Sequence, residues 1–221
     1  MIKAIFFDAA GTLLHLPGSV GEHYAAVARQ LGVELAPADL DSAFVQAWKQ
    51  SAPRSAVDGP RHDDDKPWWR DLVNAVLDQL PRLSSDLDRE CFFKRAYAHF
   101  SKPDVWMLYP DVRDVLEQLS PKYRLAVISN FDGRLRIILR QLEIASYFRH
   151  VFVSSELGAD KPDPEIFRRA LARSGVKANE ALHVGDDPQR DWAAAHTAGM
   201  HVFELDRTRN SLRDLASYLE Q

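Results

Sequence analysis

Five short apolar segments, separated by stretches with helical periodicity, constrain the fold of this 221-residue chain more than any other feature. Each segment is rich in β-branched, aromatic or other apolar residues, as strands buried on both faces of a parallel sheet are. Because strands and helices alternate, the pattern predicts a doubly wound α/β fold with a five-stranded parallel sheet. The predicted strands cover residues 2–7, 123–128, 150–153, 181–184 and 201–204.

Helical periodicity fills the spaces between the later strands. It predicts helices over residues 111–119, 132–142 and 164–174. In the last of these, Asp163 is a suitable N-cap, and Pro164 suits the first helical position because its missing N–H is not needed there.

One long stretch interrupts the alternation and predicts a separate helical unit. Its helices are expected over residues 21–31, 37–50, 68–80 and 87–100, with Ser84-Ser85-Asp86 as possible caps for the last. Residues 51–66 contain Pro53, Gly59, Pro60 and three consecutive aspartates, so we expect a polar loop without regular structure there.

The resulting domain prediction is a helical cap inserted after the first strand of an α/β core. The core comprises residues 1–14 and 104–221, and the cap comprises residues 15–103, with hinges at Pro17-Gly18 and Lys102-Pro103. The cap is expected to carry substrate specificity, although aromatic residues at helical spacing more often pack in a core. The candidates are Trp48, His62, Trp68, Trp69, Tyr97 and His99.

Polar residues follow three of the predicted strands. Asp8, Ser129 and Asp186 stand at or just beyond the carboxyl ends of their strands. In open α/β sheets, ligands bind beyond these ends, so we expect the three side chains to gather at one site.

The first of these polar sites is Asp8-Ala9-Ala10-Gly11-Thr12. A carboxylate such as Asp8 is a weak nucleophile towards an anionic phosphoryl group unless a cation offsets the repulsion. Gly11 permits a tight turn, and the backbone N–H groups of such a turn can bind an anion. An aspartate in a turn after a strand is also common without any function, so this assignment depends on the other motifs.

The second and third motifs supply groups suited to an anion. Ser129-Asn130 offers a hydroxyl and a backbone N–H to a phosphoryl oxygen, although Ser-Asn is also a frequent turn dipeptide. Lys161 lies between Asp160 and Pro162, and its ammonium can offset the charge of a phosphate and of a nearby carboxylate. An ordinary surface lysine is the alternative.

The fourth motif, Gly185-Asp186-Asp187 with Asp191 four residues further on, is the strongest single one. Carboxylates placed so closely repel one another unless a cation is present, and Mg²⁺ prefers oxygen ligands. Asp187 before Pro188 also fits a helix N-cap.

In order and spacing, these four motifs resemble those of the haloacid dehalogenase-like (HAD) hydrolases, and the insertion resembles their smaller cap type. Trp68-Trp69 and residues 127–132 further resemble the branch that includes the rhythmically expressed gene product of insects.

The resemblance implies a magnesium site and a phosphate site. Mg²⁺ would be held by Asp8, the main-chain oxygen of Ala10 and Asp186, with Asp187 and Asp191 acting through water or orienting the ligands. The phosphate of a small phosphorylated substrate would meet groups of Gly11, Thr12, Ser129, Asn130 and Lys161.

The chain departs from the family pattern at Ala10, where the phosphatases carry an aspartate that acts as general acid and base. Such a group contributes about 10²–10⁴ in rate. Four interpretations stay open: a slow or selective phosphohydrolase, a non-catalytic binding protein, a phosphonate hydrolase that uses Lys49, and a 2-haloacid dehalogenase, whose departing halide needs no proton.

Composition restricts the partners and the compartment. A net charge of −4 argues against general binding of nucleic acid or anionic membranes, which favour a basic face. No apolar run has the length of a membrane span. A single cysteine, Cys91, suits a reducing compartment, and with no visible signal peptide we expect a cytoplasmic protein. The sequence does not determine the oligomeric state.

Overall fold

The computed structural model describes residues 1–51, 54–61, 63–81, 87–102 and 104–220. The chain forms two compact units. The first, the core unit, comprises Met1–His15, Arg54–Asp64 and Met107–Gln221, and the second, the helical unit, comprises Leu16–Pro53 and Asp65–Trp106.

A five-stranded sheet organises the core unit, and it confirms the predicted α/β fold. The strands lie in the order β5-β4-β1-β6-β7, and every neighbouring pair is parallel. The first strand of the chain is therefore central. The strands are β1 (Ala4–Phe7), β4 (Arg124–Ser129), β5 (Phe148–Val153), β6 (Ala181–Gly185) and β7 (His201–Glu204).

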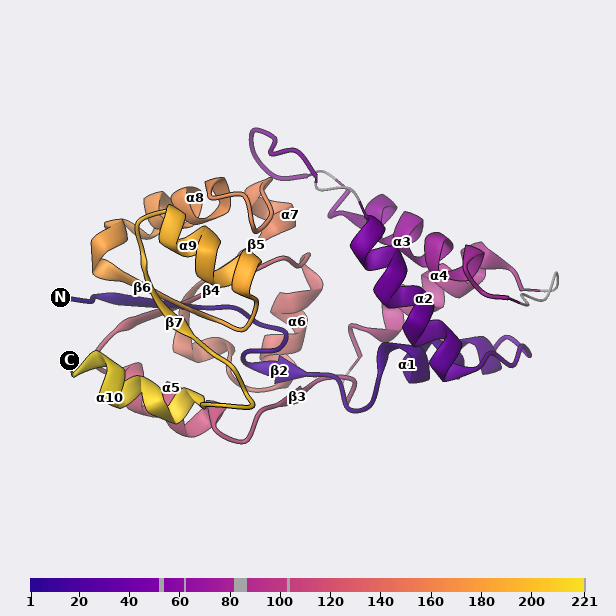
Figure 1. Ribbon diagram of the computed structural model, residues 1–221, viewed down its shortest axis with the longest axis horizontal. Coiled ribbons are helices and arrows are strands. Elements are labelled where there is room, and N and C mark those ends of the chain that lie inside the picture. Colours follow the sequence, from indigo (N-terminus) through magenta and orange to yellow (C-terminus); the bar gives the residue numbers. More distant parts are fainter. Residues whose placement is uncertain (52–53, 62, 82–86, 103, 221) are drawn as a thin grey trace. The chain divides into compact units, whose positions relative to one another are not determined.

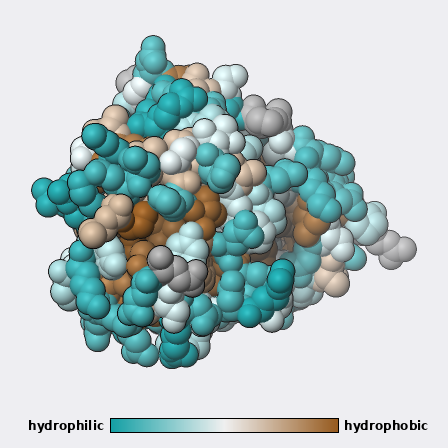
Figure 2. All heavy atoms as spheres, turned by 60° about the vertical axis from the view of Figure 1, so that its left-hand side comes forward, coloured by the Kyte–Doolittle hydropathy of each residue, from teal (hydrophilic) through white to brown (hydrophobic). Residues whose placement is uncertain are grey.

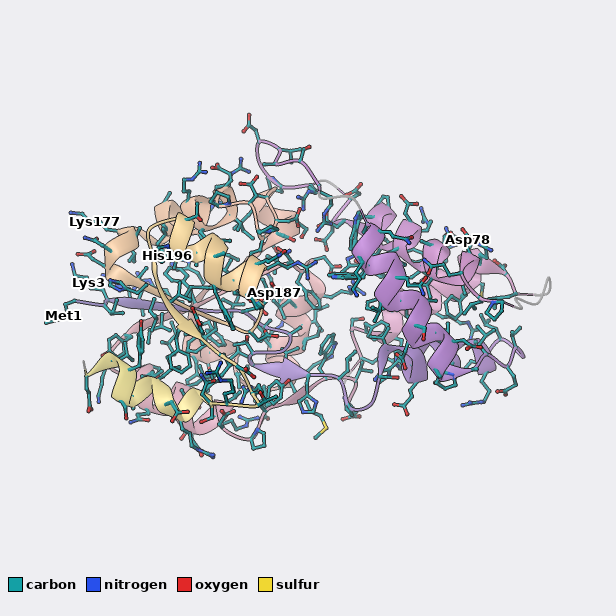
Figure 3. The ribbon with its side chains drawn as sticks, viewed as in Figure 1. Met1, Lys3, Asp78, Lys177, Asp187 and His196 are labelled. Atoms are coloured by element: carbon teal, nitrogen blue, oxygen red, sulfur yellow. The ribbon has the colours of Figure 1, made fainter. Side chains whose placement is uncertain are left out.

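The register brings the ends of the three middle strands together. Phe7 at the end of β1 pairs with Val127 of β4 on one side and Val184 of β6 on the other. The residues that follow these positions therefore meet at one edge of the sheet. In Figure 3, Asp187 lies at this carboxyl edge, whereas Met1 and Lys3 lie at the opposite end.

Helices cover both faces of the sheet, and Figure 1 shows α8 and α9 on one face and α5 and α10 on the other. The helices cover the sheet well, since Ile5, Phe6 and Phe7 of the central strand β1 are left fully buried. The helices are α5 (Val112–Leu119), α6 (Arg134–Gln141), α7 (Ser154–Leu157), α8 (Glu165–Ser174), α9 (Ala194–Thr197) and α10 (Leu215–Leu219), with short 3₁₀ turns at Ala145–Tyr147, Ala178–Glu180 and Leu212–Asp214 and a π-helical turn at Pro188–Ala193.

The start of α8 differs slightly from the prediction. The helix begins at Glu165, so Pro164 occupies the N-cap position. Asp163 nevertheless accepts a hydrogen bond from the backbone N–H of Glu165 at 2.9 Å, which satisfies one of the free donors of the first turn.

A second, two-stranded sheet was not predicted. Strand β2 (Leu14–His15) pairs antiparallel with β3 (Met107–Leu108), where the chain leaves and re-enters the core unit. Two residues per strand are too few to produce a recognisable alternation of apolar and polar side chains.

The helical unit contains the four helices predicted for the insertion, with ends that differ by two residues at most. They are α1 (Val20–Arg29), α2 (Pro37–Gln50), α3 (Lys66–Asp78) and α4 (Arg89–His99). The side chain of Asp88 caps α4 by accepting from the N–H of Cys91 at 3.0 Å. The predicted caps Ser84, Ser85 and Asp86 lie outside the described residues, as do Pro103 of the predicted hinge and the candidate His62.

The aromatic candidates for specificity pack within this unit. The ring centroids of Trp68 and Trp69 lie 4.9 Å apart, and Trp48 contacts both rings. These side chains and Tyr97 are partly buried against the apolar cluster of the unit. His99 makes a 2.9 Å hydrogen bond with His23. The contacts give these residues a packing role inside the helical unit.

Residues 54–64 differ from the prediction. They were expected in the cap, yet they belong to the core unit. The N–H of Val57 donates to the carbonyl of Gly158 at 2.8 Å, and that of Arg61 donates to Ser155 at 2.7 Å. Asp64 accepts from the Ser155 hydroxyl at 2.6 Å and from the N–H of Gly133. These partners are distant in sequence, so no local periodicity marks the segment.

The surface is mostly polar in the view of Figure 2, where hydrophilic side chains cover most of the face and the largest group of hydrophobic ones lies left of centre. None of the described helices combines the length and apolar composition needed to cross a membrane.

Candidate active site

Asp8 is the centre of the candidate site. It follows the fully buried strand β1, and its own N–H donates to the carbonyl of Val184 at 2.8 Å, which continues the sheet by one residue. The residue is only 6% exposed. Its Oδ1 atom accepts from Nζ of Lys161 at 2.5 Å. A buried carboxylate is thus fixed at the end of a central strand by one cation.

Lys161 contacts two carboxylates at once. Its Nζ atom also donates to Oδ1 of Asp191 at 2.6 Å. The lysine is held by Asn130, whose side-chain amide donates to the carbonyl of Lys161 and accepts from its N–H, both at 2.7 Å. Asn130, expected at the phosphate, therefore positions the lysine loop in this structure.

The loop before Lys161 is held from the other side by residues 54–64. Asp160 forms ion pairs with Arg54 and Arg61, and the Arg61–Asp160 contact measures 2.5 Å. Two arginines on one carboxylate restrain Asp160, because each ion pair limits the orientation of its side chain. The predicted polar loop thus supports the peptide that carries the lysine.

The Asp191 carboxylate accepts hydrogen bonds from three donors. Besides Lys161, Oδ1 accepts from Nε2 of His183 at 2.8 Å, and Oδ2 accepts from the N–H of Asp187 at 3.1 Å. Gly185 makes room for it, because a Cβ there would lie 2.3 Å from Cγ of Asp191. These three donors, Lys161 among them, fix the orientation of the Asp191 carboxylate.

Sequence reasoning missed His183. It lies in β6 and is fully buried, with its ring edge against Phe167 at 5.0 Å between centroids. Its Nδ1 atom has no hydrogen-bond partner among the described residues. The one indication was a polar residue inside the apolar segment Ala181-Leu182-His183-Val184, which is unusual for a strand buried on both faces.

Asp186 lies beside the turn that follows Asp8. Its Oδ1 atom accepts from the Thr12 hydroxyl at 2.9 Å. Gly11 has φ of +91°, and a Cβ there would lie 2.3 Å from Oδ2 of Asp186. The glycine therefore serves both the backbone conformation and the close approach of the carboxylate.

Asp187 and Ala10 complete the predicted set. Oδ1 of Asp187 accepts from the N–H groups of Gln189 at 2.9 Å and Arg190 at 2.7 Å, so it is the N-cap of the turn that follows β6. Ala10 is exposed, next to the buried Ala9. Ser129 is buried at the end of β4, and its hydroxyl favours the ionised form of Asp8, which lowers the pKa of that carboxyl.

The charges of the site are unbalanced. Asp8, Asp186 and Asp191 each offer an oxygen, and these atoms all lie within 4.8 Å of one another. Among the described residues, the basic side chains in ion-pair contact with these carboxylates are Lys161 and His183. No ion pair within the described part of the chain reaches Asp186, so one carboxylate has no cation of its own.

The pKa values follow this distribution. Burial raises the pKa of Asp8, and the attraction of Lys161 reduces that rise. Burial and the neighbouring Asp8 raise the pKa of Asp186 to about 6. Burial alone would raise the pKa of Asp191, but Lys161 and His183 hold it well below its ordinary value. Burial opposes the charge of Lys161, yet Asp191 and Asp8 raise its pKa above the usual range.

Comparison with known proteins identifies the family. Residues 2–199 match the haloacid dehalogenase-like hydrolase family. The chain belongs to this family of hydrolases. The family assignment agrees with the sheet order, in which the aspartate after the central strand faces the lysine loop and the aspartates after β6.

Relatives place the chain more finely within the family. It is 32% identical over 216 residues to haloacid dehalogenase-like hydrolase domain-containing protein 3 of Danio rerio, covering 93% of this chain and 86% of that protein. It is 28% identical to the rhythmically expressed gene 2 protein of Drosophila melanogaster, covering 90% and 81%. The predicted resemblance to that branch is confirmed.

Among solved structures, the chain is similar to a 2-haloacid dehalogenase of Pseudomonas syringae. The TM-score is 0.68 and the identity 25%, with 100% of this chain and 99% of the other covered.

Proposed function

We propose that this protein is a Mg²⁺-dependent phosphohydrolase that acts on a small phosphorylated substrate, with Asp8 as the nucleophile. The observation that carries the proposal is the pairing of a buried Asp8 with Lys161, next to a second carboxylate, Asp186, that has no cation among the described residues. The core unit would hold the reacting groups, and the helical unit would act as the cap.

The donor set fits Mg²⁺. This ion prefers oxygen ligands, keeps several waters and is usually bound through one or two carboxylates. Asp8 and Asp186 offer such oxygens within 4.8 Å of one another, and the raised pKa of Asp186 reflects a site that favours added positive charge. We propose that Asp8, Asp186 and the carbonyl of Ala10 hold the ion, with Asp191 and Asp187 positioning the surrounding groups.

Bound Mg²⁺ would offset the charge of the phosphoryl group and of the attacking carboxylate. The remaining contributions come from side chains of the chain itself. The ammonium of Lys161 holds the Asp8 carboxylate in place and adds positive charge for the incoming phosphate, and the Ser129 hydroxyl lowers the pKa of that carboxyl.

The reaction then takes two displacements. A carboxylate oxygen of Asp8 attacks phosphorus, the bond to the leaving oxygen breaks, and a phospho-aspartate forms. Water then attacks the phosphorus and releases phosphate, which restores the carboxylate. In both displacements the electron pair of the broken bond stays on the departing oxygen.

Ala10 restricts which leaving groups depart readily. Its methyl group cannot donate a proton, so an alkoxide would leave as a strong base. Acyl and aryl phosphates give weakly basic leaving groups that need little proton transfer. We therefore propose that the preferred substrates are acyl or aryl phosphates, or esters whose leaving oxygen receives its proton from water or from the substrate itself.

The 2-haloacid dehalogenase reaction is the second candidate, since the Pseudomonas syringae enzyme is 25% identical and a halide needs no proton. Against it, a 2-haloacid carries a carboxylate of its own. The described residues form no ion pair with Asp186, so its negative charge would repel that of the substrate. Phosphonate cleavage is less well supported because Lys49 is exposed on α2, and a lysine forms an imine readily when burial lowers its pKa.

A substrate panel tests the proposal. Aryl, acyl, sugar and nucleotide phosphates are assayed with Mg²⁺ and with chelator, next to 2-haloacids assayed for halide release. We expect Mg²⁺-dependent phosphate release that is lost in Asp8→Asn. Halide release without Mg²⁺ would establish the dehalogenase instead, and no turnover of either class would favour a non-catalytic binding protein.

We further propose that the protein is cytoplasmic. Its single cysteine, Cys91, is a free thiol, and free thiols persist in a reducing compartment. Imaging of the tagged full chain would check this location.

A further inference from the structure

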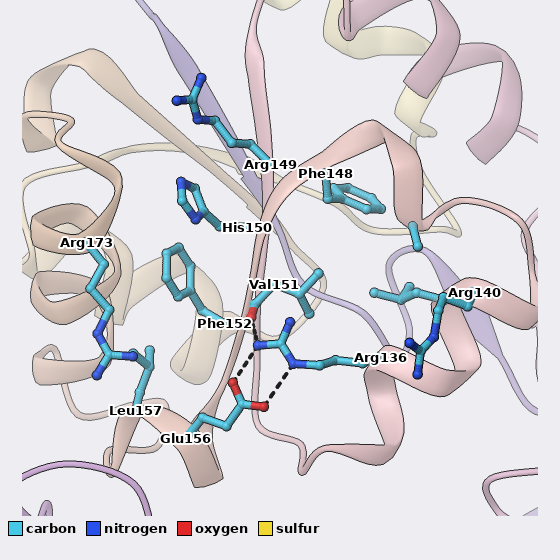
Figure 4. Close-up of a pocket in the computed structure, with 12 residues that line it drawn as sticks. Arg136, Arg140, Phe148, Arg149, His150, Val151, Phe152, Glu156, Leu157 and Arg173 are labelled. Atoms are coloured by element: carbon cyan, nitrogen blue, oxygen red, sulfur yellow. Dashed lines mark hydrogen bonds and ion pairs between the residues drawn. The ribbon is translucent and has the colours of Figure 1, made fainter.

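A hollow of about 500 Å³ lies along the free edge of strand β5 (Figure 4). Its walls come from α6, from β5 itself and from α7 and α8. Small-molecule sites typically measure about 300–1,000 Å³, so the size suits a metabolite. β5 is separated from β1 by β4, and none of the candidate active-site residues lines this hollow.

The walls carry an excess of positive charge. Four arginines face one glutamate, which leaves three positive charges in excess, although the chain as a whole carries −4. The charged and titratable lining residues are Arg136, Arg140, Arg149, His150, Glu156 and Arg173.

The single carboxylate is already engaged. Arg136 forms two bonds with Glu156, at 2.9 and 2.5 Å, and also donates to the carbonyl of Val151 at 2.7 Å. Within the part of the chain that the structure describes, Arg140, Arg149 and Arg173 form no ion pair. No carboxylate of the described residues therefore neutralises these three arginines of the lining.

The arrangement favours an extended anion. In Figure 4, Arg140 and Arg173 lie on opposite flanks of β5. A single phosphate would contact one flank, whereas linked phosphoryl groups can reach from one to the other. Arginine binds phosphate through several N–H groups in a fixed plane, which suits such a ligand.

One wall also suits a planar ring. His150 and Phe152 stack with 5.3 Å between ring centroids and 14° between planes. A nucleobase placed against these rings would continue the stack, because every base has a π-face that stacks on aromatic side chains.

We propose that the hollow beside β5 is a second binding site of this protein, for a small molecule that carries a di- or triphosphate chain. The assignment does not depend on the reaction at Asp8. Charged side chains on an edge strand also discourage pairing with other chains. That role alone predicts no bound anion, so binding separates the two explanations.

Titration calorimetry without Mg²⁺ tests the site on the full chain, with tripolyphosphate, pyrophosphate and ADP as probes. The variant that changes the hollow, called the groove variant below, combines Arg140→Glu with Arg173→Glu. The matched control is Arg95→Glu with Arg124→Glu, two exposed arginines elsewhere with the same change in net charge. We expect Kd to rise at least tenfold in the groove variant and to stay within threefold of the native value in the control.

Lys161→Ala separates this site from the candidate active site. If the hollow is the site, this variant binds tripolyphosphate as the native protein does. Equal losses in the groove and control variants, loss in Lys161→Ala alone, or no binding by the native protein at millimolar probe would overturn the proposal. Tighter binding of ADP than of pyrophosphate would assign a contact to the His150–Phe152 wall, and equal binding would assign the ligand to a phosphate chain alone. An oligonucleotide that binds more tightly than all three probes, and whose binding is lost in the groove variant, would overturn the small-molecule assignment.

Discussion

The ammonium of Lys161 lies 2.5 Å from Oδ1 of Asp8, and both side chains are buried. The same ammonium contacts Asp191. One cation therefore holds two buried carboxylates that would otherwise repel each other, so its removal has a cost in stability as well as in activity.

Lys161→Met should lower the free energy of unfolding by about 3–5 kcal/mol at pH 7, because removal of one partner leaves buried charges unpaired. Urea denaturation without Mg²⁺ measures the change. The matched control is Lys177→Met, which alters an exposed lysine and should stay within about 0.5 kcal/mol of the native protein. Similar values for the two variants would contradict the proposed role of the pair.

Binding of Mg²⁺ should weaken below neutral pH. The pKa of Asp186 in the folded protein is about 6, above its ordinary value of 3.8, so this carboxyl gains a proton as pH falls through 6. A protonated carboxyl does not bind the ion, and at pH 5 about one tenth of the groups are ionised, so affinity should fall about tenfold between pH 7 and pH 5. Calorimetric titration at the two pH values measures this.

The same group has an opposite effect on stability without metal. Because its folded pKa is raised, Asp186 contributes stability below pH 3.8, and that contribution is lost as pH rises through 6. In Asp186→Asn, both this pH dependence and most of the Mg²⁺ binding should disappear. Unchanged metal affinity in that variant would rule out Asp186 as a ligand.

Gly11→Ala should impair the site more than an equivalent change elsewhere. The new Cβ would lie 2.3 Å from Asp186, so the carboxylate would have to move, and Mg²⁺ binding should weaken. Gly175→Ala is the matched control, because Gly175 also has positive φ but no atom within 4 Å of the added Cβ. Both variants carry the backbone penalty, which unfolding measures, and only Gly11→Ala should lose metal affinity. Equal metal affinity in the two would show that the close approach is unimportant.

The sequence was sufficient to predict the parts of the fold that have local periodicity. All five strands of the sheet were predicted to within about two residues at their ends, because each is an apolar run bounded by polar residues. Asp8 could be placed at the site because it follows the first strand directly. The pairing of Leu14 with Leu108 could not be predicted, since it joins residues distant in the chain over a two-residue strand.

Side-chain partners were less predictable than positions. Asn130 stands where the motif puts it, but its amide is occupied by the backbone of Lys161, which only the folded loop reveals. The same holds for residues 54–64, whose hydrogen bonds reach Gly158 and Ser155. Such contacts depend on tertiary arrangement, and composition alone carries no information about them.

His183 should influence the reaction through Asp191, although it touches no substrate. His183→Leu removes the Nε2 donor, which lies 2.8 Å from Asp191, and should lower stability by about 1–3 kcal/mol. If the carboxylate then shifts, Lys161 is misplaced, so kcat should fall while KM stays nearly constant. Steady-state kinetics on an aryl phosphate measures this.

The conservative variant separates positioning from packing. His183→Gln keeps an N–H donor and should recover much of the kcat lost in His183→Leu. Loss of stability in both variants with unchanged kcat would give His183 a purely structural role.

The last prediction concerns Ala10, whose side chain is exposed beside Asp8 and therefore leaves room for a carboxyl. If the site lacks only its acid, the native rate should depend steeply on the pKa of the leaving group, with aryl phosphates far ahead of alkyl phosphates. Ala10→Asp should then raise the rate on alkyl phosphates by up to about 10²–10⁴ and change the rate on aryl phosphates much less. The control is Ala10→Asn, because asparagine has nearly the same shape as aspartate but no acidic proton, and it should give no such gain. A native rate that is independent of the leaving group would mean that another side chain already donates the proton, and an equal gain in Ala10→Asn would mean that Ala10→Asp acts through binding.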